Sequence, residues 1–171
     1  MKLLLAASVV AGGALLSGCA SYRAELVLDP VGPPPAASPG AGSIGTLVVY
    51  SAFEQGAEFN SAYYRRQYTD YKILSANGKL LQPVHNDSGT LAEAPNRVQL
   101  PAGTYRIIAR ANGYGEVIVP VVIRASQVTR VHLEGSAAWP NGQELTKSNP
   151  VRLPDGEIAG WRASTDPSAK E

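Results

Sequence analysis

The fold of this chain is decided by residues 97–111, which read Arg97-Val98-Gln99-Leu100-Pro101-Ala102-Gly103-Thr104-Tyr105-Arg106-Ile107-Ile108-Ala109-Arg110-Ala111. Two runs of alternating apolar and polar residues flank the tight turn at residues 101–103, so the stretch predicts two neighbouring β-strands. Successive side chains of a strand point to opposite sides. We therefore expect one buried face in the second strand, made of Tyr105, Ile107 and Ala109. Arg106 and Arg110 would lie on the opposite face.

Further strand candidates lie on both sides of this stretch. They are rich in β-branched and aromatic residues, and they occupy residues 46–50, 68–74, 79–84, 117–123 and 128–133. Asn77-Gly78 favours the positive φ angles of a type I′ turn, which predicts a β-hairpin around residues 75–78. Short strands at this spacing, with almost no helical signal between them, predict an all-β fold built as a single antiparallel sandwich.

The last two strand candidates each have a buried face. In residues 117–123 the inward positions are Val117, Val119, Val121 and Ile123, and in residues 128–133 they are Thr129, Val131 and Leu133. Arg130 and His132 would point outward. Pro120 has no N–H group for a ladder, so we expect its strand to lie at a sheet edge or to contain a bulge.

The segment Val98-Gln99-Leu100-Pro101-Ala102-Gly103-Thr104-Tyr105, together with Gly113-Tyr114 and the strand pair 119–123 and 129–133, resembles carboxypeptidase regulatory-like and PEGA-type domains. The likeness is close over residues 98–133 and loose over 46–97. It implies a prealbumin-like, seven-stranded antiparallel β-sandwich over residues 44–135. It also implies a non-catalytic module of a cell-surface or periplasmic protein. The aromatic segment 53–71 and the last 36 residues depart from the family pattern.

The N-terminus predicts export. Lys2 precedes an apolar run over residues 3–16, which is too short to span a membrane and is typical of a signal peptide covering residues 1–18. Leu16-Ser17-Gly18-Cys19 resembles the bacterial lipobox, which implies cleavage before Cys19 and acylation of its thiol. Ala20 after the cysteine resembles the pattern of lipoproteins passed to an outer membrane. The alternative is an ordinary secretory signal followed by a chance free cysteine.

Residues 19–43 are predicted to be a lipidated tether. Five prolines and three glycines between Ala20 and Ser43 disfavour helices and strands, so we expect neither there. Residues 40–45 match G-x-G-x-x-G literally. A dinucleotide site needs a strand before these glycines and a helix after them, and the surrounding sequence offers neither.

Charge and cysteine content exclude several function classes. The chain has 15 Lys and Arg against 14 Asp and Glu, and removal of Lys2 with the signal peptide leaves 14 against 14. A neutral domain lacks the positive charge that nucleic-acid binding requires. The single cysteine excludes an internal disulfide, and His85 and His132 have no partner at metal-ligand spacing, so we expect no metal and no cofactor. His85-Asn86-Asp87-Ser88 is expected to be a solvated loop rather than a catalytic constellation.

Aromatic residues are concentrated between residues 50 and 71. Within this segment, Tyr63, Tyr64, Arg66 and Tyr68 combine aromatic faces with a guanidinium group, a composition enriched at binding hot spots. In an extended segment, Tyr64, Arg66 and Tyr68 share one side. The alternative is that these rings cap the sandwich and serve burial.

The C-terminal extension, residues 136–171, contains Trp139 and Trp161. Residues 151–161 predict a short hairpin around Pro154-Asp155-Gly156, followed by a frayed polar tail. The two tryptophans would either pack the extension onto the sheet or hold a glycan or a protein partner.

Together these features predict no enzyme. We expect a non-catalytic module, held to a membrane of the cell envelope by Cys19, that binds or scaffolds another envelope protein. The alternative is a carbohydrate-binding module that uses exposed tyrosine and tryptophan rings. The sequence also predicts that residues 44–135 fold without the tether or the tail.

Overall fold

The computed structural model of the protein describes residues 25–34, 42–55, 66–86, 94–135, 139–140 and 149–163. These residues form strands and no helix, so the prediction of an all-β fold is confirmed. No helix in the described ranges is long and apolar enough to cross a membrane.

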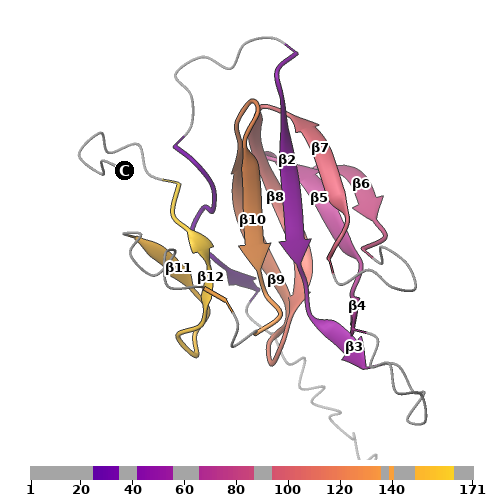
Figure 1. Ribbon diagram of the computed structural model, residues 1–171, viewed down its shortest axis with the longest axis vertical. Coiled ribbons are helices and arrows are strands. Elements are labelled where there is room, and N and C mark those ends of the chain that lie inside the picture. The colour runs from indigo at the N-terminus through magenta and orange to yellow at the C-terminus, as the bar shows by residue number, and fades with distance from the viewer. Residues whose placement is uncertain are drawn as a thin grey trace, which may run out of the picture.

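Two larger sheets make up most of the fold. The five-stranded sheet has the order β1 (Leu26–Val27), β9 (Gly115–Ile123), β8 (Gly103–Ala111), β5 (Tyr71–Ser75) and β6 (Leu80–Val84). The three-stranded sheet has the order β10 (Val128–His132), β2 (Ile44–Tyr50) and β7 (Arg97–Pro101). Figure 1 shows the three-stranded sheet in front of the five-stranded one.

Two small strand pairs complete the structure. One is the pair β3 (Phe53–Gln55) and β4 (Arg66–Tyr68), and the other is the hairpin β11 (Pro150–Arg152) and β12 (Ile158–Trp161). In Figure 1 the first pair lies below the end of β2, and the hairpin lies beside β10. The predicted C-terminal hairpin is therefore confirmed.

The hydrophobic core is built from the alternating faces that the sequence predicts. Ile107 and Ala109 on β8 are buried, as are all four predicted inward residues of β9. Tyr105 is only half-buried, because its ring lies at the margin of the cluster and its hydroxyl donates to the Pro101 carbonyl at 2.9 Å. The expectation that Tyr105 points fully inward is thus wrong in degree.

Two strand pairs are parallel, which corrects the expected antiparallel arrangement. β10 runs parallel to β2 over five residue pairs, from Val128↔Thr46 to His132↔Tyr50. β1 runs parallel to β9. Parallel neighbours need a long connection between them, and here about 80 residues separate β2 from β10.

A strand also forms in the segment that was expected to contain none. Backbone hydrogen bonds continue beyond β1, from the Leu28 N–H to the Ile118 carbonyl and from the Val31 N–H to the Pro120 carbonyl, both at 2.9 Å. Leu28 and Val31 are buried in the core, with Val31 only 1% exposed. Three apolar residues, Leu26, Leu28 and Val31, pack against the core beside β9, and their burial outweighs the effect of the neighbouring prolines.

Pro120 lies in an interior strand, not at an edge, because β1 covers the outer side of β9. The Pro120 carbonyl accepts from Val31, so its nitrogen also faces this N-terminal segment. The segment passes this point at Asp29-Pro30, where no ladder hydrogen bond to the proline nitrogen is required. A missing N–H group is therefore tolerated.

The hairpin between β5 and β6 is confirmed, but its turn type differs from the prediction. Gly78 has a φ of 87°, whereas Asn77 is not among the described residues with positive φ. The Gly78 N–H donates to the Ser75 carbonyl at 2.9 Å, and the Ser75 N–H donates to the Lys79 carbonyl at 2.8 Å. This is a type I turn followed by a bulge at glycine, and the bulge is what needs the positive φ.

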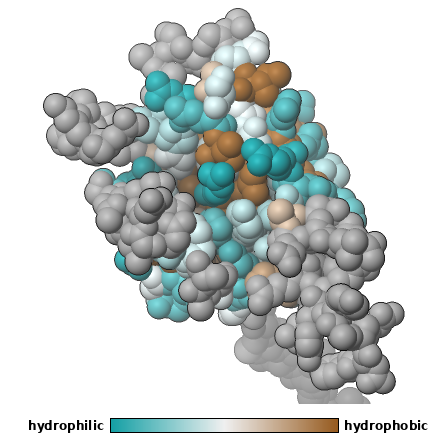
Figure 2. Space-filling model, in the orientation of Figure 1, coloured by the Kyte–Doolittle hydropathy of each residue, from teal (hydrophilic) through white to brown (hydrophobic). Residues whose placement is uncertain are grey.

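The outer face of the three-stranded sheet mixes apolar and charged side chains. Val48 is buried on this face, and it pairs with Arg97 on β7 and with Arg130 on β10. Figure 2, in the same orientation as Figure 1, shows hydrophobic residues between hydrophilic ones in the middle of the molecule. The aliphatic stems of such arginines shield apolar neighbours while their charged ends stay in water.

Candidate binding site

A continuous chain of aromatic rings crosses one end of the molecule. Its members, in order of contact, are Phe53, Tyr68, Tyr50, His132, Trp139 and Trp161. They come from β3, β4, the ends of β2 and β10, the loop at residues 139–140, and β12. Because β2 and β10 are parallel and in register, Tyr50 and His132 are direct neighbours. We call this set the aromatic chain.

The centre of the aromatic chain is a sandwich around His132. The imidazole stacks on Tyr50 with a centroid distance of 4.2 Å and an interplanar angle of 9°, and on Trp139 at 3.6 Å and 7°. Trp139 then contacts Trp161 at 6.1 Å in a tilted arrangement. His132 was expected to face outward, and it does lie on the outer face of β10, but Trp139 covers it so that only 6% is exposed.

His132 is paired with a buried carboxylate. Its Nδ1 lies 2.8 Å from Oε1 of Glu134, which follows the end of β10 by two residues and is 4% exposed. The backbone at Glu134 is held in place by Asn112, whose N–H donates to the Leu133 carbonyl at 2.9 Å and whose side-chain amide donates to the Glu134 carbonyl. The β8–β9 turn therefore positions the carboxylate.

A pocket of about 270 Å³ opens beside this pair. Its lining combines aromatic, aliphatic and charged residues, namely His132, Glu134, Gly135, Trp139, Pro140, Arg152, Gly156, Glu157 and Ile158. The β11–β12 hairpin supplies four of them. Because Val151, Leu153 and Ala159 of the same hairpin segment are buried in the core, the wall of the pocket is fixed to the main fold.

The described lining of the pocket has more negatively than positively charged side chains. Two carboxylates and one guanidinium line it. Nη1 of Arg152 donates to the Gly156 carbonyl at 2.5 Å, across the turn of its own hairpin. The Glu157 carboxylate lies against Gly135, since a Cβ added at Gly135 would be 2.9 Å from Glu157 Oε2. Both carboxylates thus lie near the same short stretch of backbone.

The structure brings some of the predicted site residues together. Tyr68, Trp139 and Trp161 all belong to the aromatic chain, and all are half-buried. Arg66 pairs with Gln55 in the β3–β4 ladder. Tyr63, Tyr64 and Cys19, the predicted site of lipidation, lie outside the described residues.

Sequence reasoning missed the residues that connect these groups. Tyr50 and His132 join Tyr68 to the tryptophans, although 82 residues separate them in the chain. The one available signal was His132-x-Glu134, because an i, i+2 spacing places both side chains on one face of a strand. Glu157 and Arg152 gave no signal beyond their place in the hairpin.

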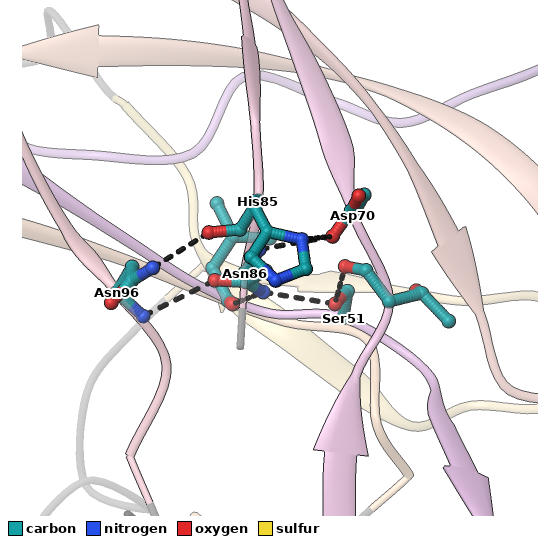
Figure 3. Close-up of polar contacts among 7 residues, drawn as sticks. Ser51, Asp70, His85, Asn86 and Asn96 are labelled. Carbon is teal, nitrogen blue, oxygen red and sulfur yellow. Dashed lines mark hydrogen bonds and ion pairs between the residues drawn. The ribbon is translucent and has the colours of Figure 1, made fainter. Parts of the chain in front are cut away.

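A second polar cluster surrounds Asn86, and it is structural (Figure 3). The Asn86 amide donates to the Val49 carbonyl at 2.9 Å and to Ser51 Oγ at 3.0 Å. Its Oδ1 accepts from the Asn96 N–H, and its own N–H donates to Asp70. Asn86 is fully buried, so the prediction of a solvated loop is wrong at this residue. Asp87 and Ser88 lie outside the described residues.

The same cluster contains Ser51, His85 and Asp70, but not as a catalytic triad. The Ser51 hydroxyl is fully buried and donates to the Thr69 carbonyl at 2.6 Å. His85 and Asp70 form an exposed pair at 2.9 Å, and Figure 3 draws no contact from this pair to Ser51. In a catalytic triad the nucleophilic hydroxyl is hydrogen-bonded to the histidine, whereas the Ser51 hydroxyl donates to the Thr69 carbonyl.

Across the described ranges, no group of three or more His, Cys, Asp and Glu side chains is arranged to hold a metal ion. Comparison of the chain with family models, with curated proteins and with solved structures found no match.

Proposed function

We propose that this protein is a non-catalytic, lipid-anchored module of the cell envelope that binds another envelope protein. Its fold would be of the prealbumin-like type found in carboxypeptidase regulatory-like and PEGA-type domains. Seven strands of the two larger sheets fall between Ile44 and His132, which supports that assignment. The parallel pairing of β2 and β10 departs from the antiparallel arrangement that the resemblance implies.

The observation that carries the proposal is the composition of edge strand β6. Leu80 and Leu81 are consecutive residues at the point where the pairing of β6 with β5 shifts by one residue, and they are 52% and 49% exposed. Pro83 on the same strand has no N–H to offer a further strand, which limits open-ended pairing. Because Pro83 limits the addition of a further strand, a partner would contact β6 through the two exposed leucine side chains.

Crosslinking in envelope preparations tests this proposal. The variant with Leu80→Lys and Leu81→Lys should lose its crosslinked partner while keeping its unfolding midpoint, because both side chains are half-exposed. Ile44→Lys is the matched control, since Ile44 is an exposed aliphatic residue at 53% on another strand. Equal crosslinking by wild type and the β6 variant would reject β6 as the contact surface.

The lipid anchor has its own test. Labelled palmitate should be incorporated into the wild-type chain and not into Cys19→Ser, and the labelled protein should fractionate with the outer membrane. Labelling that persists in Cys19→Ser would exclude the anchor.

Carbohydrate binding is the second candidate, and the pocket wall at Trp139 favours it. Its rings pack on one another instead of forming a bare row: Trp139 lies on His132 at 3.6 Å and beside Trp161 at 6.1 Å. A glycan would therefore enter the pocket rather than lie across a flat platform. Retention of the protein on immobilised cell-wall glycan, lost in Trp139→Ala, would support this candidate.

A further inference from the structure

The pocket beside Trp139 is lined by two residues that each have a buried polar atom without a hydrogen-bond partner. These atoms are Nε2 of His132 and Oε2 of Glu134, and no donor or acceptor reaches either of them within the described residues. Both residues line the pocket, and both are more than nine-tenths buried. The other atom of each pair is used, because His132 Nδ1 and Glu134 Oε1 meet at 2.8 Å.

Such atoms are uncommon in folded proteins. Leaving a buried polar group unpaired destabilises the fold, and more so for a charged group. Two of them on residues that line one cavity indicate a site that is completed by a bound group. The aromatic sandwich prevents His132 from turning away, because Tyr50 and Trp139 stack on both of its faces.

The two atoms define what the bound group must offer. An ionised carboxylate only accepts hydrogen bonds, so the contact with Glu134 places a hydrogen on His132 Nδ1. In the neutral imidazole, Nε2 is then an acceptor as well. Glu134 Oε2 is therefore an unused acceptor, and Nε2 is a second one while the imidazole is neutral, so a fitting ligand is a hydrogen-bond donor.

The remaining wall favours a positive charge on that donor. Glu157 adds a second carboxylate, and Trp139 adds an aromatic ring, which attracts cations. Among the described residues that line this pocket, Arg152 is the only lysine or arginine, and its guanidinium is held by the Gly156 carbonyl. A volume of about 270 Å³ is small for a ligand pocket and suits a head group with a short apolar stem.

We propose that the pocket formed by His132, Glu134, Trp139 and Glu157 binds a primary ammonium or guanidinium group on a short apolar stem. This site is separate from the β6 surface, and it does not depend on the proposed protein contact there. The cation would come either from a small free amine or from a lysine or arginine side chain of another protein.

Indole N–H resonances provide a direct test, because the chain has two tryptophans and both lie in the aromatic chain. The full chain carrying Cys19→Ser is labelled on tryptophan and titrated with n-butylguanidinium and with n-butylammonium. The Trp139 indole signal should shift and saturate. The neutral analogue n-pentanol and methyl glucoside should bind at least tenfold more weakly.

Two variants separate the charge from the fold. Glu134→Gln keeps the shape and the contact with His132, and it should weaken the cation at least tenfold. Glu157→Gln changes an exposed rim residue whose loss leaves the core intact, so it should weaken binding even if Glu134→Gln fails to fold. Glu116→Gln, an exposed carboxylate on β9 outside the pocket, is the matched control and should bind as wild type does.

Equal affinity for n-pentanol, tighter binding of methyl glucoside, or an unchanged affinity in Glu157→Gln would overturn the proposal. A further arm identifies the source of the cation. Tighter binding of a capped Gly-Arg-Gly or Gly-Lys-Gly peptide than of the free amines would support a protein side chain, and the reverse order would support a small molecule.

Discussion

The hydrophobic core contains a buried tyrosine, Tyr71, whose hydroxyl group affects the stability of the fold. The Tyr71 hydroxyl is buried without a hydrogen-bond partner among the described residues. Tyr71→Phe removes this unpaired group and should raise the free energy of unfolding by about 1 kcal/mol, as measured by urea denaturation at neutral pH. A loss of stability in Tyr71→Phe would show that the hydroxyl has a partner.

The same residue gives a pH dependence. Burial raises the pKa of Tyr71 well above the ordinary value of 10. The folded state therefore keeps a proton that the unfolded state releases, so stability should be constant below pH 10 and should fall as pH rises above it. Tyr71→Phe should reduce this alkaline loss. An identical alkaline slope in both proteins would assign the effect to other groups.

Asn86 makes the opposite case, a buried polar residue with its partners in place. Asn86→Ala removes the hydrogen bonds of this side chain to the Val49 carbonyl, the Ser51 hydroxyl and the Asn96 N–H, and it should cost about 2–4 kcal/mol in urea denaturation. The neighbouring His85→Ala removes an exposed ion pair and should cost less than about 1 kcal/mol. Similar losses for the two variants would contradict the assigned role of Asn86.

At the scale of elements, the N-terminal strand and the C-terminal hairpin depend on each other. A Cβ added at Gly160 on β12 would lie 2.5 Å from Val31 Cγ1, so no larger residue fits while Val31 stays in place. Gly160→Ala should therefore cost about 1–3 kcal/mol through overpacking.

Combining Gly160→Ala with Val31→Ala should cost less than the sum of the two single changes, since each makes room for the other. Gly103→Ala is the control, because a Cβ there would make only ordinary contacts at 3.7 Å and beyond. Additive losses in the double variant would show that the two segments do not touch in solution.

At the scale of the whole molecule, one core is shared by segments that the sequence divides among three regions. Leu28 and Val31 come from the predicted tether, and Val151, Leu153 and Ala159 come from the C-terminal extension, yet all five belong to the same cluster as the sheet residues. A fragment of residues 44–135 loses their packing. At about 1.5–3 kcal/mol for each large buried side chain, it should be at least ~5 kcal/mol less stable than residues 25–163.

Thermal unfolding of the two fragments measures this difference. Domains have only about 5–15 kcal/mol of stability in total, so the shorter fragment should unfold at a much lower temperature or remain unfolded. Equal midpoints would restore the independent domain that the sequence predicts.

The sequence predicted what is local and failed where contacts are distant. Alternation placed Ile107, Ala109 and the inward residues of β9, and Asn77-Gly78 placed a hairpin, because both signals lie within a few residues. β1 is two residues long and lies among prolines, so only its packing against β9 reveals it. The aromatic chain was likewise found in part: Tyr68 and the tryptophans stood out by type, whereas their connection through His132 requires the β2–β10 pairing.

The pairing of β1 with β9 divides the chain between Cys19 and Ile44 into a short segment before β1 and a longer segment after it. With β1 in place, only residues 20–25 separate the proposed acylated cysteine from the folded body, a leash of at most ~20 Å at ~3.5 Å per residue. If tension on the anchor peels β1 away, the leash extends to residue 43 and reaches ~80 Å. On an acylated chain, residues 26–31 would therefore set how far the domain can stand from the lipid surface, and their release would increase that reach about fourfold.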